Sequence, residues 1–242
     1  MSFWDSDSEY GKYFYKIAVG ELPEMECSKA ICKVLNPIYD HDKKILDVAC
    51  GGGHYLKSFL ERIDPNIDYT GIDATKHYIE LARKAFPERG KFKLGNIFNI
   101  PFSDQTFDIV MANNVLLHLP PNPIEALQEL VRVSKEYIII RTTFGERNYV
   151  IQEVRGSSES ENPYVEDKPR SSNYFNLYTK DYFRRVFSEI SPSLKVKIIK
   201  DESFKNFDTR DQTNNNTGTK TVNGVQYSGN IILDWRFIII SK

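Results

Sequence analysis

The chain has 242 residues, of which 40% are hydrophobic and 27% are charged, and its formal net charge is -1. This length suits one large α/β domain with a sizeable core. The balanced charge gives no support for a nucleic-acid-binding surface, because such surfaces carry an excess of Lys and Arg.

The first ten residues are acidic and polar, so we expect no secretory signal. No apolar run approaches the roughly 20 residues that a membrane helix needs, and we expect no membrane partner. Three cysteines, Cys27, Cys32 and Cys50, are odd in number and lack the spacing of metal ligands. We therefore predict free thiols, no metal, and a reduced, cytoplasmic location.

Taken in chain order, apolar and aromatic residues first recur at helical spacing between residues 7 and 38, which predicts one or two helices ahead of a sheet. Strand-like and helix-like patterns then alternate from residue 44 to residue 144. The expected strands are 44–50, 67–73, 91–97, 107–114 and 137–144, and the expected helices are 54–63, 77–86 and 123–134. Strands separated by helices of about ten residues indicate βαβ units and a parallel sheet.

The remainder of the chain has a different character. Residues 145–176 mix charged, Ser, Pro and Tyr residues. A segment of this length is typically functional or disordered, and its tyrosines favour a packed lid over complete disorder. The last expected elements are a helix over 179–190, a strand over 194–204, a polar tract over 212–224 and a strand over 232–242. We expect the two last strands to form an antiparallel hairpin at one sheet edge.

The fold predicted from this order is a three-layer α/β sandwich of the Rossmann-like kind. Its sheet would have seven mostly parallel strands with an antiparallel last strand, preceded by N-terminal helices and interrupted by the lid insertion. We expect a single domain, divided into an N-terminal helical cap (1–43), a ligand-binding core (44–144), the lid (145–176), and a C-terminal helix with a strand hairpin (177–242).

The stretch ILDVACGGGH, residues 45–54, places three consecutive glycines after an apolar strand that contains Asp47. A dinucleotide site would need G-x-G-x-x-G, but the third glycine position holds Leu56. A dinucleotide site would also keep an apolar residue where Asp47 stands. No Gly-Lys-Ser/Thr follows the strand either, so a phosphate-binding role fits poorly. An acid ahead of the glycines favours a cationic ligand, although a tight strand–helix turn with a buried acid is the simpler alternative.

The same stretch resembles the first motif of class I S-adenosylmethionine-dependent methyltransferases, in which an acid precedes three alternating glycines. Asp47, Ala49, Gly51 and Gly53 fall on its four positions, and Ala49 is a small-for-small replacement of the first glycine. The resemblance implies that this turn, Cys50 included, binds S-adenosyl-L-methionine and later S-adenosyl-L-homocysteine. This cofactor carries an ammonium and a sulfonium, which suits an acid.

Three later stretches resemble further motifs of this family. Asp73 ends the second strand and would accept the ribose hydroxyls, although capping the next helix is an alternative. In LGNIFNIPF, residues 94–102, Asn96 replaces the usual aspartate. The resemblance also implies roles for the following residues: Ala74, Thr75, Asn96 and Ile97 around the adenine, and Asn113, Asn114 and Val115 near the methionine portion. The asparagines could instead be ordinary loop residues at a strand end.

Relatives in this family also suggest candidates near the methyl acceptor. A preceding helix often closes the pocket with an aromatic residue, for which Tyr10 and Tyr13 are candidates. His118, after the fourth strand, is the candidate catalytic base, and a structural role is its alternative. We expect a solvated or capping role for His54. The candidates for shaping the acceptor pocket, or for packing under the lid, are Arg141, Tyr149, Tyr174 and Tyr178.

We therefore expect a methyltransferase that transfers a methyl group from S-adenosylmethionine to a small-molecule acceptor by in-line displacement. An RNA or protein methyltransferase is one alternative, and a cofactor-binding module without catalysis is another. A nicotinamide oxidoreductase is a more remote one. Nucleic acid is disfavoured as a partner, because no Asn/Asp-Pro-Pro-Tyr/Phe follows the fourth strand. The acceptor and the oligomeric state do not follow from the sequence.

Overall fold

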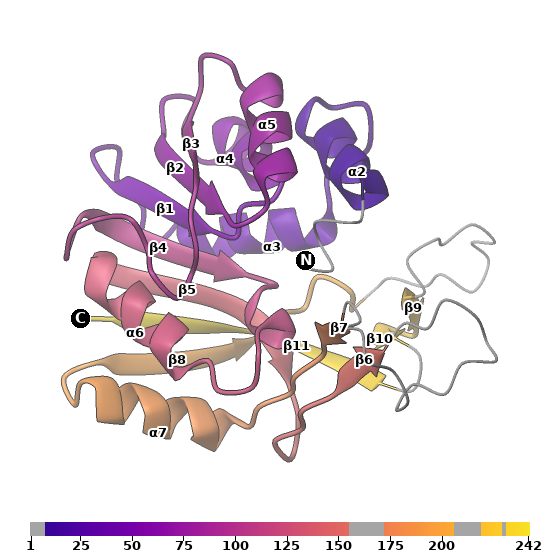
Figure 1. Ribbon diagram of the computed structural model, residues 1–242, viewed down its shortest axis with the longest axis vertical. Helices are drawn as coiled ribbons and strands as arrows, with labels where there is room; N and C mark the ends of the chain where they lie inside the picture. Colours follow the sequence, from indigo (N-terminus) through magenta and orange to yellow (C-terminus); the bar gives the residue numbers. More distant parts are fainter. Residues whose placement is uncertain (1–7, 155–171, 206–218, 229–230) are drawn as a thin grey trace, which may run out of the picture.

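The structure is a computed structural model that describes residues 8–154, 172–205, 219–228 and 231–242. Helices and strands alternate through most of the chain (Figure 1). The helices are α2 (Ser8–Ala18), α3 (Glu26–Leu35), α4 (His54–Arg62), α5 (Lys76–Ala85), the 3-10 turn η1 (Leu116–His118), α6 (Ile124–Val133) and α7 (Lys180–Ile190). The strands are β1 (Lys44–Val48), β2 (Asp68–Asp73), β3 (Lys91–Leu94), β4 (Phe107–Asn113), β5 (Ser134–Phe144), β6 (Gln152–Val154), β7 (Ser172–Tyr174), β8 (Lys195–Lys200), β9 (Thr219–Val222), β10 (Val225–Ser228) and β11 (Ile231–Ser241).

The main sheet has the strand order β3-β2-β1-β4-β5-β11-β10-β9, and β8 also pairs with β11. Strands β1 to β5 are parallel to one another, whereas β11 is antiparallel to both β5 and β8. The order reverses between β1 and β4, and ligands of open α/β sheets bind at such a switch point. The predicted Rossmann-like sandwich, mostly parallel with an antiparallel last strand, is confirmed.

Two strands, β9 and β10, extend this sheet beyond the predicted seven. They form a hairpin whose first strand and turn come from the tract that we expected to be a polar loop, and whose second strand directly follows it. Its turn is Asn223-Gly224, with φ values of 51° and 76°. These left-handed values at both central residues fit the tight hairpin turn that Asn-Gly favours. A Cβ at Gly224 would also lie 2.6 Å from the carbonyl oxygen of Lys205, so only glycine fits there.

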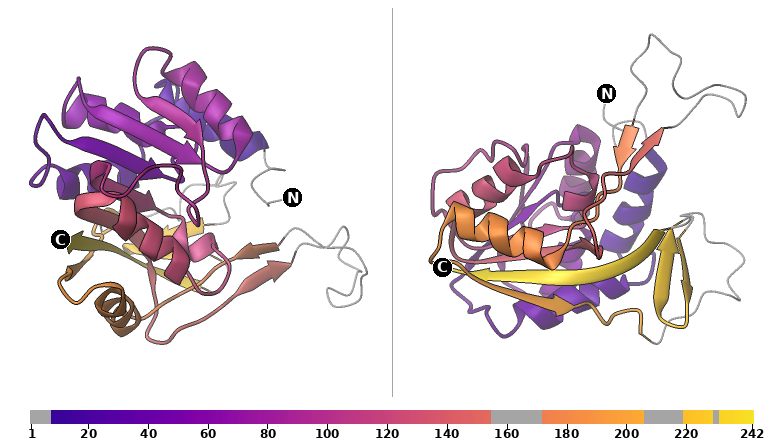
Figure 2. Two further views of the ribbon diagram at one scale, coloured as in Figure 1. Left: turned by 60° about the vertical axis from the view of Figure 1, so that its left-hand side comes forward. Right: turned by 90° about the horizontal axis from the view of Figure 1, so that it is seen from below.

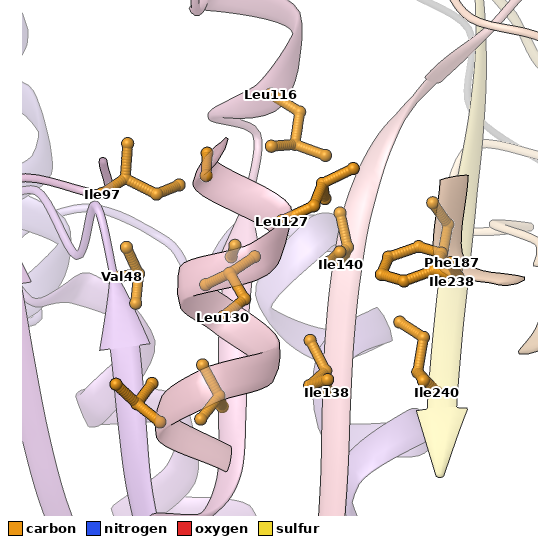
Figure 3. Close-up of a cluster of buried hydrophobic side chains, with 14 of the residues drawn as sticks. Val48, Ile97, Leu116, Leu127, Leu130, Ile138, Ile140, Phe187, Ile238 and Ile240 are labelled. Atoms are coloured by element: carbon orange, nitrogen blue, oxygen red, sulfur yellow. The ribbon is translucent and has the colours of Figure 1, made fainter. Parts of the chain in front are cut away.

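Two helical layers cover the sheet. Helices α3, α4 and α5 pack on one face, and α6 and α7 pack on the other (Figures 1 and 2). Helix α2 packs on α4 and α5. Figure 3 shows the core on the α6 side, where apolar residues of β1, β5 and β11 meet the inner faces of both helices. These side chains alternate along each strand with those that face the other layer, as the two-residue period of a strand requires.

The crossover from β3 to β4 contains no α-helix, because a loop over residues 95–106 takes its place. Ile97 and Ile100 in this loop are buried in the core on the α6 side. The guanidinium of Arg132 holds the loop by donating to the carbonyl oxygens of Ile100 and Phe102. The loop is therefore packed against the core on the α6 side and tied to α6 by hydrogen bonds.

Strands β5 and β11 are longer than the strands that precede them. Asn113, the last residue of β4, is in register with Arg141, and β5 continues for three further residues to Phe144. Phe144 is in turn in register with Asp234 of β11. We call this paired extension, Thr142–Phe144 with the β11 residues opposite, the overhang. The insertion after β5 leaves from it, and the β10 hairpin joins β11 beside it.

The insertion begins and ends with chain that is folded against the core. Tyr149 and Leu177 exchange backbone hydrogen bonds of 2.8 and 2.9 Å, and β6 pairs with β7 further out. Residues 155–171 of the predicted lid lie outside the described residues, as do residues 212–218 of the polar tract. Across the described ranges, no helix combines the length and apolar character needed to cross a bilayer.

Candidate functional site

The glycine turn between β1 and α4 has three residues in left-handed conformations. Ala49, Gly51 and Gly53 have φ values of 62°, 54° and 77°. Such values cost an alanine about 1 kcal/mol or more. Alanine in place of the first motif glycine therefore strains the backbone at residue 49, whereas we had expected only a small increase in side-chain volume. A Cβ on Gly51 would meet no atom within 4 Å, whereas one on Gly53 would lie 3.1 Å from the Phe92 ring. Gly51 thus faces an open cradle, and Gly53 permits close packing of α4 on the sheet.

Asp73 fastens this turn to the carboxyl end of β2. Its Oδ2 accepts the backbone N–H of Gly51 at 2.9 Å, and its Oδ1 accepts the backbone N–H of Thr75 at 2.8 Å. The second bond forms an Asx turn that leads into α5, so the helix-start alternative describes part of its role. The carboxylate is nonetheless at the edge of the turn, where the family places the ribose.

Asp47 is a buried acid in the middle of the sheet, with 1% of its surface exposed. Its Oδ2 accepts the hydroxyl of Tyr69 at 2.7 Å, and its Oδ1 has no hydrogen-bond partner among the described residues. Burial raises the pKa of Asp47 to about 7, because the charged form loses its water. An approaching ammonium would supply both the missing partner and the missing counter-charge.

Two further residues at the carboxyl-end edge of the sheet have buried polar atoms without a partner in the described chain. These atoms are both amide atoms of Asn113, at the end of β4, and Nδ1 of His54, at the start of α4. Buried polar groups are nearly always hydrogen-bonded in native proteins, so orphaned ones mark a place where a ligand or water completes the structure. An acid, an amide and an open glycine cradle together fit the methionine end of S-adenosylmethionine.

His54 is buried, contrary to the solvated or capping role that we expected. Its ring stacks on Phe14 of α2, with centroids 4.7 Å apart, and lies 4.3 Å from the ring of Tyr55. Burial lowers the pKa of His54 to about 4, so the imidazole is neutral at physiological pH. Phe14 is therefore the α2 aromatic that reaches the glycine turn. Tyr13 is 42% exposed and touches the edge of Phe14, and its cofactor contact stays a prediction.

Sequence reasoning missed Phe14, although its helical spacing carried a signal. Gly11, Ile17 and Ala18 are buried on the same helix, and a spacing of three or four residues places Phe14 on that face. The aromatic candidates chosen from this helix were the neighbouring residues Tyr10 and Tyr13. The structure instead brings the apolar ring inward.

The residues predicted around the adenine lie at the ends of β2 and β3. The backbone N–H of Gly95 donates to the Asp73 carbonyl oxygen, which places Asn96 beside the β2 end. Asn96 is exposed, and its Oδ1 accepts the Phe98 backbone N–H at 3.0 Å. Ala74 is exposed as well, and Ile97 is buried in the core. Their roles in binding remain predictions.

Cys50 lies within the turn but points into the protein. Its side chain is fully buried, and its Sγ occupies the space next to Gly71, where a Cβ would come within 2.8 Å. Burial raises the pKa of this thiol, so it is not a reactive thiolate. Only the backbone of Cys50 is available to a ligand in the turn.

Asn114 follows β4 in a left-handed conformation, with φ of 59°. Its Oδ1 accepts from the Arg141 guanidinium at 2.5 Å, and its Nδ2 donates to the hydroxyl of Tyr55 at 3.4 Å. Arg141 is itself paired with buried Asp201 after β8. Arg141 was a candidate from the sequence, but no sequence pattern indicated that it would pair with Asp201 or connect through Asn114 to Tyr55.

His118, the candidate base, lies at the end of η1 and contacts the insertion. Its Nδ1 is 2.9 Å from the carbonyl oxygen of Tyr174, and its ring meets the edge of Phe175 at 5.6 Å. A carbonyl oxygen only accepts, so Nδ1 carries the proton and Nε2 carries the lone pair of the neutral ring. The geometry therefore combines a docking contact with a nitrogen that can accept a proton.

The remaining acceptor-side candidates divide between core and surface. Tyr178 is buried and stacks on Tyr182 of α7 at 4.6 Å, which is the packing role that we weighed as its alternative. Tyr149 is exposed and lines a cavity of about 840 Å³ together with Phe144, Leu177 and Arg236. This cavity lies between the base of the insertion, the start of α7 and the start of β11.

The comparisons with known proteins identify the family of this chain. A family model described as a methyltransferase domain matches residues 39–189, which is more than half of the chain. A demethylmenaquinone methyltransferase of Geobacillus sp. is 35% identical over 97 residues, covering 38% of this chain and 41% of that protein. The chain spans less than half the length of the curated relatives it matches.

Solved structures share the fold at low sequence identity. A SAM-dependent methyltransferase from Methanosarcina mazei has a TM-score of 0.58 and 18% identity, covering 86% of this chain and 96% of the other. The 1,6-didemethyltoxoflavin-N1-methyltransferase of Burkholderia thailandensis, solved with bound 1,6-didemethyltoxoflavin and S-adenosylhomocysteine, has a TM-score of 0.58 and 13% identity. The match covers 90% of this chain and 79% of the other.

A switch-point site built from an acid, a glycine turn and strand-end carboxylate and amide groups defines the class of Rossmann-like methyltransferases. The chain belongs to the methyltransferase domain family, and within it to the class I S-adenosylmethionine-dependent methyltransferases. S-adenosylmethionine is the cofactor that this family uses.

Proposed function

We propose that this chain transfers the methyl group of S-adenosylmethionine to a small-molecule acceptor. The observation that carries the small-molecule assignment is the way the insertion folds back against η1. Asn176 is fully buried; its backbone N–H donates to the Leu117 carbonyl oxygen at 2.8 Å, and its Nδ2 donates to that of Leu119 at 2.7 Å. The end of the insertion therefore covers η1, which follows the carboxyl end of β4. A site covered in this way suits a small acceptor better than a macromolecule.

Two of the compared proteins support this assignment. One is a demethylmenaquinone methyltransferase, and the other is an N1-methyltransferase solved with 1,6-didemethyltoxoflavin bound. The balanced charge of the chain also favours a small acceptor over RNA, because RNA binding draws on clustered Lys and Arg.

We assign the cofactor to the switch point between β1 and β4. Asp47 and Asn113 would meet the methionine end, Asp73 the ribose, and Phe14 on α2 would cover the turn. The full set that we propose for cofactor binding is Asp47, Ala49, Cys50, Gly51, Gly53, Asp73, Ala74, Asn96, Ile97, Asn113, Asn114 and Tyr13. Cys50 would contribute only its backbone.

When bound, the cofactor supplies an activated methyl group and its own leaving group. The protein has to align the acceptor, exclude water and, for a hydroxyl acceptor, accept a proton. With Nδ1 of His118 donating to the Tyr174 carbonyl oxygen, Nε2 is the ring atom that would take that proton. An amine or thiolate acceptor would need no such base.

The cofactor assignment is tested by thermal melts of the purified chain with S-adenosylhomocysteine and, separately, with NADH. A ligand at 100 times its dissociation constant adds roughly 2.7 kcal/mol to stability. We expect stabilisation by S-adenosylhomocysteine alone, and its loss in Asp73→Asn. The matched control is Asp68→Asn, at the other end of β2, where the carboxylate is surface-exposed and pairs with Lys91. Stabilisation by NADH alone would contradict the assignment.

The acceptor class is tested with S-adenosylmethionine labelled in its methyl group. The chain is incubated with pooled small metabolites, total RNA or total protein, and the label is then separated into solvent-extractable and acid-precipitable fractions. We expect label in the extractable fraction, and its loss in Asp73→Asn. Label confined to RNA or protein would refute the small-molecule assignment while leaving the cofactor site in place.

A further inference from the structure

Arg141 is a buried charge at the carboxyl end of β5 that has no direct part in the proposed reaction. Only 1% of its surface is exposed, and its Nε donates to Oδ2 of Asp201 at 2.6 Å. Asp201 is buried too, and the Trp235 ring lies 4.1 Å from the guanidinium carbon. An ion pair at this depth adds little net stability, because both charges lose their water.

The same guanidinium decides which way the Asn114 amide points. The backbone N–H of Asn114 donates to the Arg141 carbonyl oxygen at 2.9 Å, and the Arg141 side chain donates back to Oδ1 of Asn114 at 2.5 Å. An arginine only donates, so the amide atom facing it has to be the oxygen. The amide nitrogen, with its two N–H groups, therefore points away from Arg141.

The hydrogen bonds continue in one direction beyond Asn114. Its Nδ2 donates to the Tyr55 hydroxyl at 3.4 Å, and this hydroxyl donates to Sγ of Cys27 at 3.7 Å. Tyr55 is the second residue of α4, the helix that starts at the glycine turn. The Asp201–Arg141 pair is thus connected, through one amide, to the start of the cofactor-binding helix.

We propose that Arg141 is a positioning residue for the cofactor: held by Asp201, it orients the Asn114 amide so that the N–H not bonded to Tyr55 is presented to the methionine carboxylate. The inference rests on the proposed cofactor site. Donors suit the carboxylate of that amino-acid end, just as Asp47, which only accepts when ionised, suits its ammonium. Asp47 would then accept hydrogen bonds from the ammonium of the methionine end, and Asn114 would donate one to its carboxylate.

The first test uses Asn114→Asp, which keeps an oxygen for Arg141 and a residue type that accepts a φ of 59°, but removes both N–H donors. We expect S-adenosylhomocysteine to bind about tenfold or more weakly by calorimetry, with no loss of melting temperature. Asn114→Gly, which tolerates the same backbone conformation, should lose a similar factor. Wild-type affinity in Asn114→Asp would overturn the proposal.

The second test removes the ion pair without leaving a buried charge alone. In Arg141→Met/Asp201→Asn, the new amide oxygen at position 201 can still accept the Ser203 backbone N–H that Asp201 accepts at 2.9 Å. We expect about a tenfold loss of affinity for S-adenosylhomocysteine, and no further loss when Asn114→Gly is added. Additive losses, or wild-type affinity in the double variant, would overturn the role of Arg141. If the double variant does not fold, Asn114→Asp decides alone.

A matched control removes a different Arg–carboxylate ion pair, one that involves the last residue of α4. Arg62 contacts both carboxylate oxygens of Glu24, at the far end of the helix from the turn. Arg62→Met/Glu24→Gln should bind S-adenosylhomocysteine as the wild type does, and a tenfold loss there would overturn the argument for a local effect of Arg141. Failure of the wild type itself to bind would overturn the cofactor site, whereas binding that is unchanged by the Arg141 and Asn114 variants would overturn only this inference.

Discussion

Replacing Asp47 with asparagine should make the protein more stable and a poorer binder of its cofactor. The carboxyl is buried, and one of its oxygens has no partner among the described residues. Burial raises its pKa from 3.8 to about 7. At about 1.4 kcal/mol for each unit of pKa, this difference corresponds to roughly 4 kcal/mol of unfolding free energy that is lost when Asp47 ionises in the folded protein.

The pH window follows from these two pKa values. Between about pH 4 and pH 7 the unfolded chain has lost the Asp47 proton and the folded chain keeps it, so this group's contribution to stability falls as the pH rises. Above pH 7 the contribution is flat. An asparagine side chain at this position has no proton to lose, and its amide can still accept from Tyr69. The difference in melting temperature between Asp47→Asn and wild type should therefore grow from near zero at pH 4 to about 10 °C at pH 8.

Thermal melts of both proteins from pH 4 to pH 8.5 measure this difference. The pH dependence contributed by the other carboxylates is the same in both proteins and cancels in the difference. Calorimetry should show the opposite effect on function: S-adenosylhomocysteine should bind the wild type with proton release below pH 7, and Asp47→Asn about tenfold more weakly without proton release. A melting-temperature difference that is independent of pH, or a less stable variant at pH 8, would refute the reasoning.

Three further substitutions have defined outcomes. Ala49→Gly relieves a left-handed alanine at φ of 62° and should raise the melting temperature by about 2 °C, the strain relief being partly offset by chain entropy; a lower value would contradict it. Gly71→Ala places a Cβ 2.8 Å from the sulfur of Cys50 and should cost about 1–3 kcal/mol in denaturant melts, with partial recovery when Cys50→Ala is added, because the Phe92 ring still lies 3.0 Å from the new Cβ. His118→Asn keeps a donor for the Tyr174 carbonyl oxygen but lacks a base, so kcat for a hydroxyl acceptor should fall about 100-fold or more at unchanged affinity for S-adenosylhomocysteine; unchanged kcat would leave His118 a docking residue only.

The parts of the site that could be predicted are those encoded in short stretches of sequence. Asp47 and the glycines lie in one strand and its turn, and Asp73 and Asn113 each end a strand whose pattern of apolar residues is plain. Because parallel strands bring their carboxyl ends to one edge, the sequence order alone places these groups together. The Asn223-Gly224 hairpin was equally local, and its signal was present but was read as part of a polar loop.

The parts that could not be predicted depend on register between distant segments. Arg141 and Asp201 are 60 residues apart: Arg141 lies in β5 and Asp201 directly follows β8, and β11 separates these two strands. Their meeting requires the register of β5 with β11 and of β11 with β8, and a shift of one residue would send each side chain to the other face. The burial of His54 similarly depends on how α2 packs over the turn, which no local pattern specifies.

The overhang gives the molecule two zones that can change independently. The strands that bear the proposed cofactor groups stop at Asn113 and earlier, whereas β5 and β11 continue about 10 Å further and carry the insertion and the β10 hairpin. Insertions or substitutions in those outer segments would leave the register of the cofactor strands untouched. Evolution can therefore change the acceptor by altering the segments that the overhang carries, while the strands of the proposed cofactor site stay unchanged.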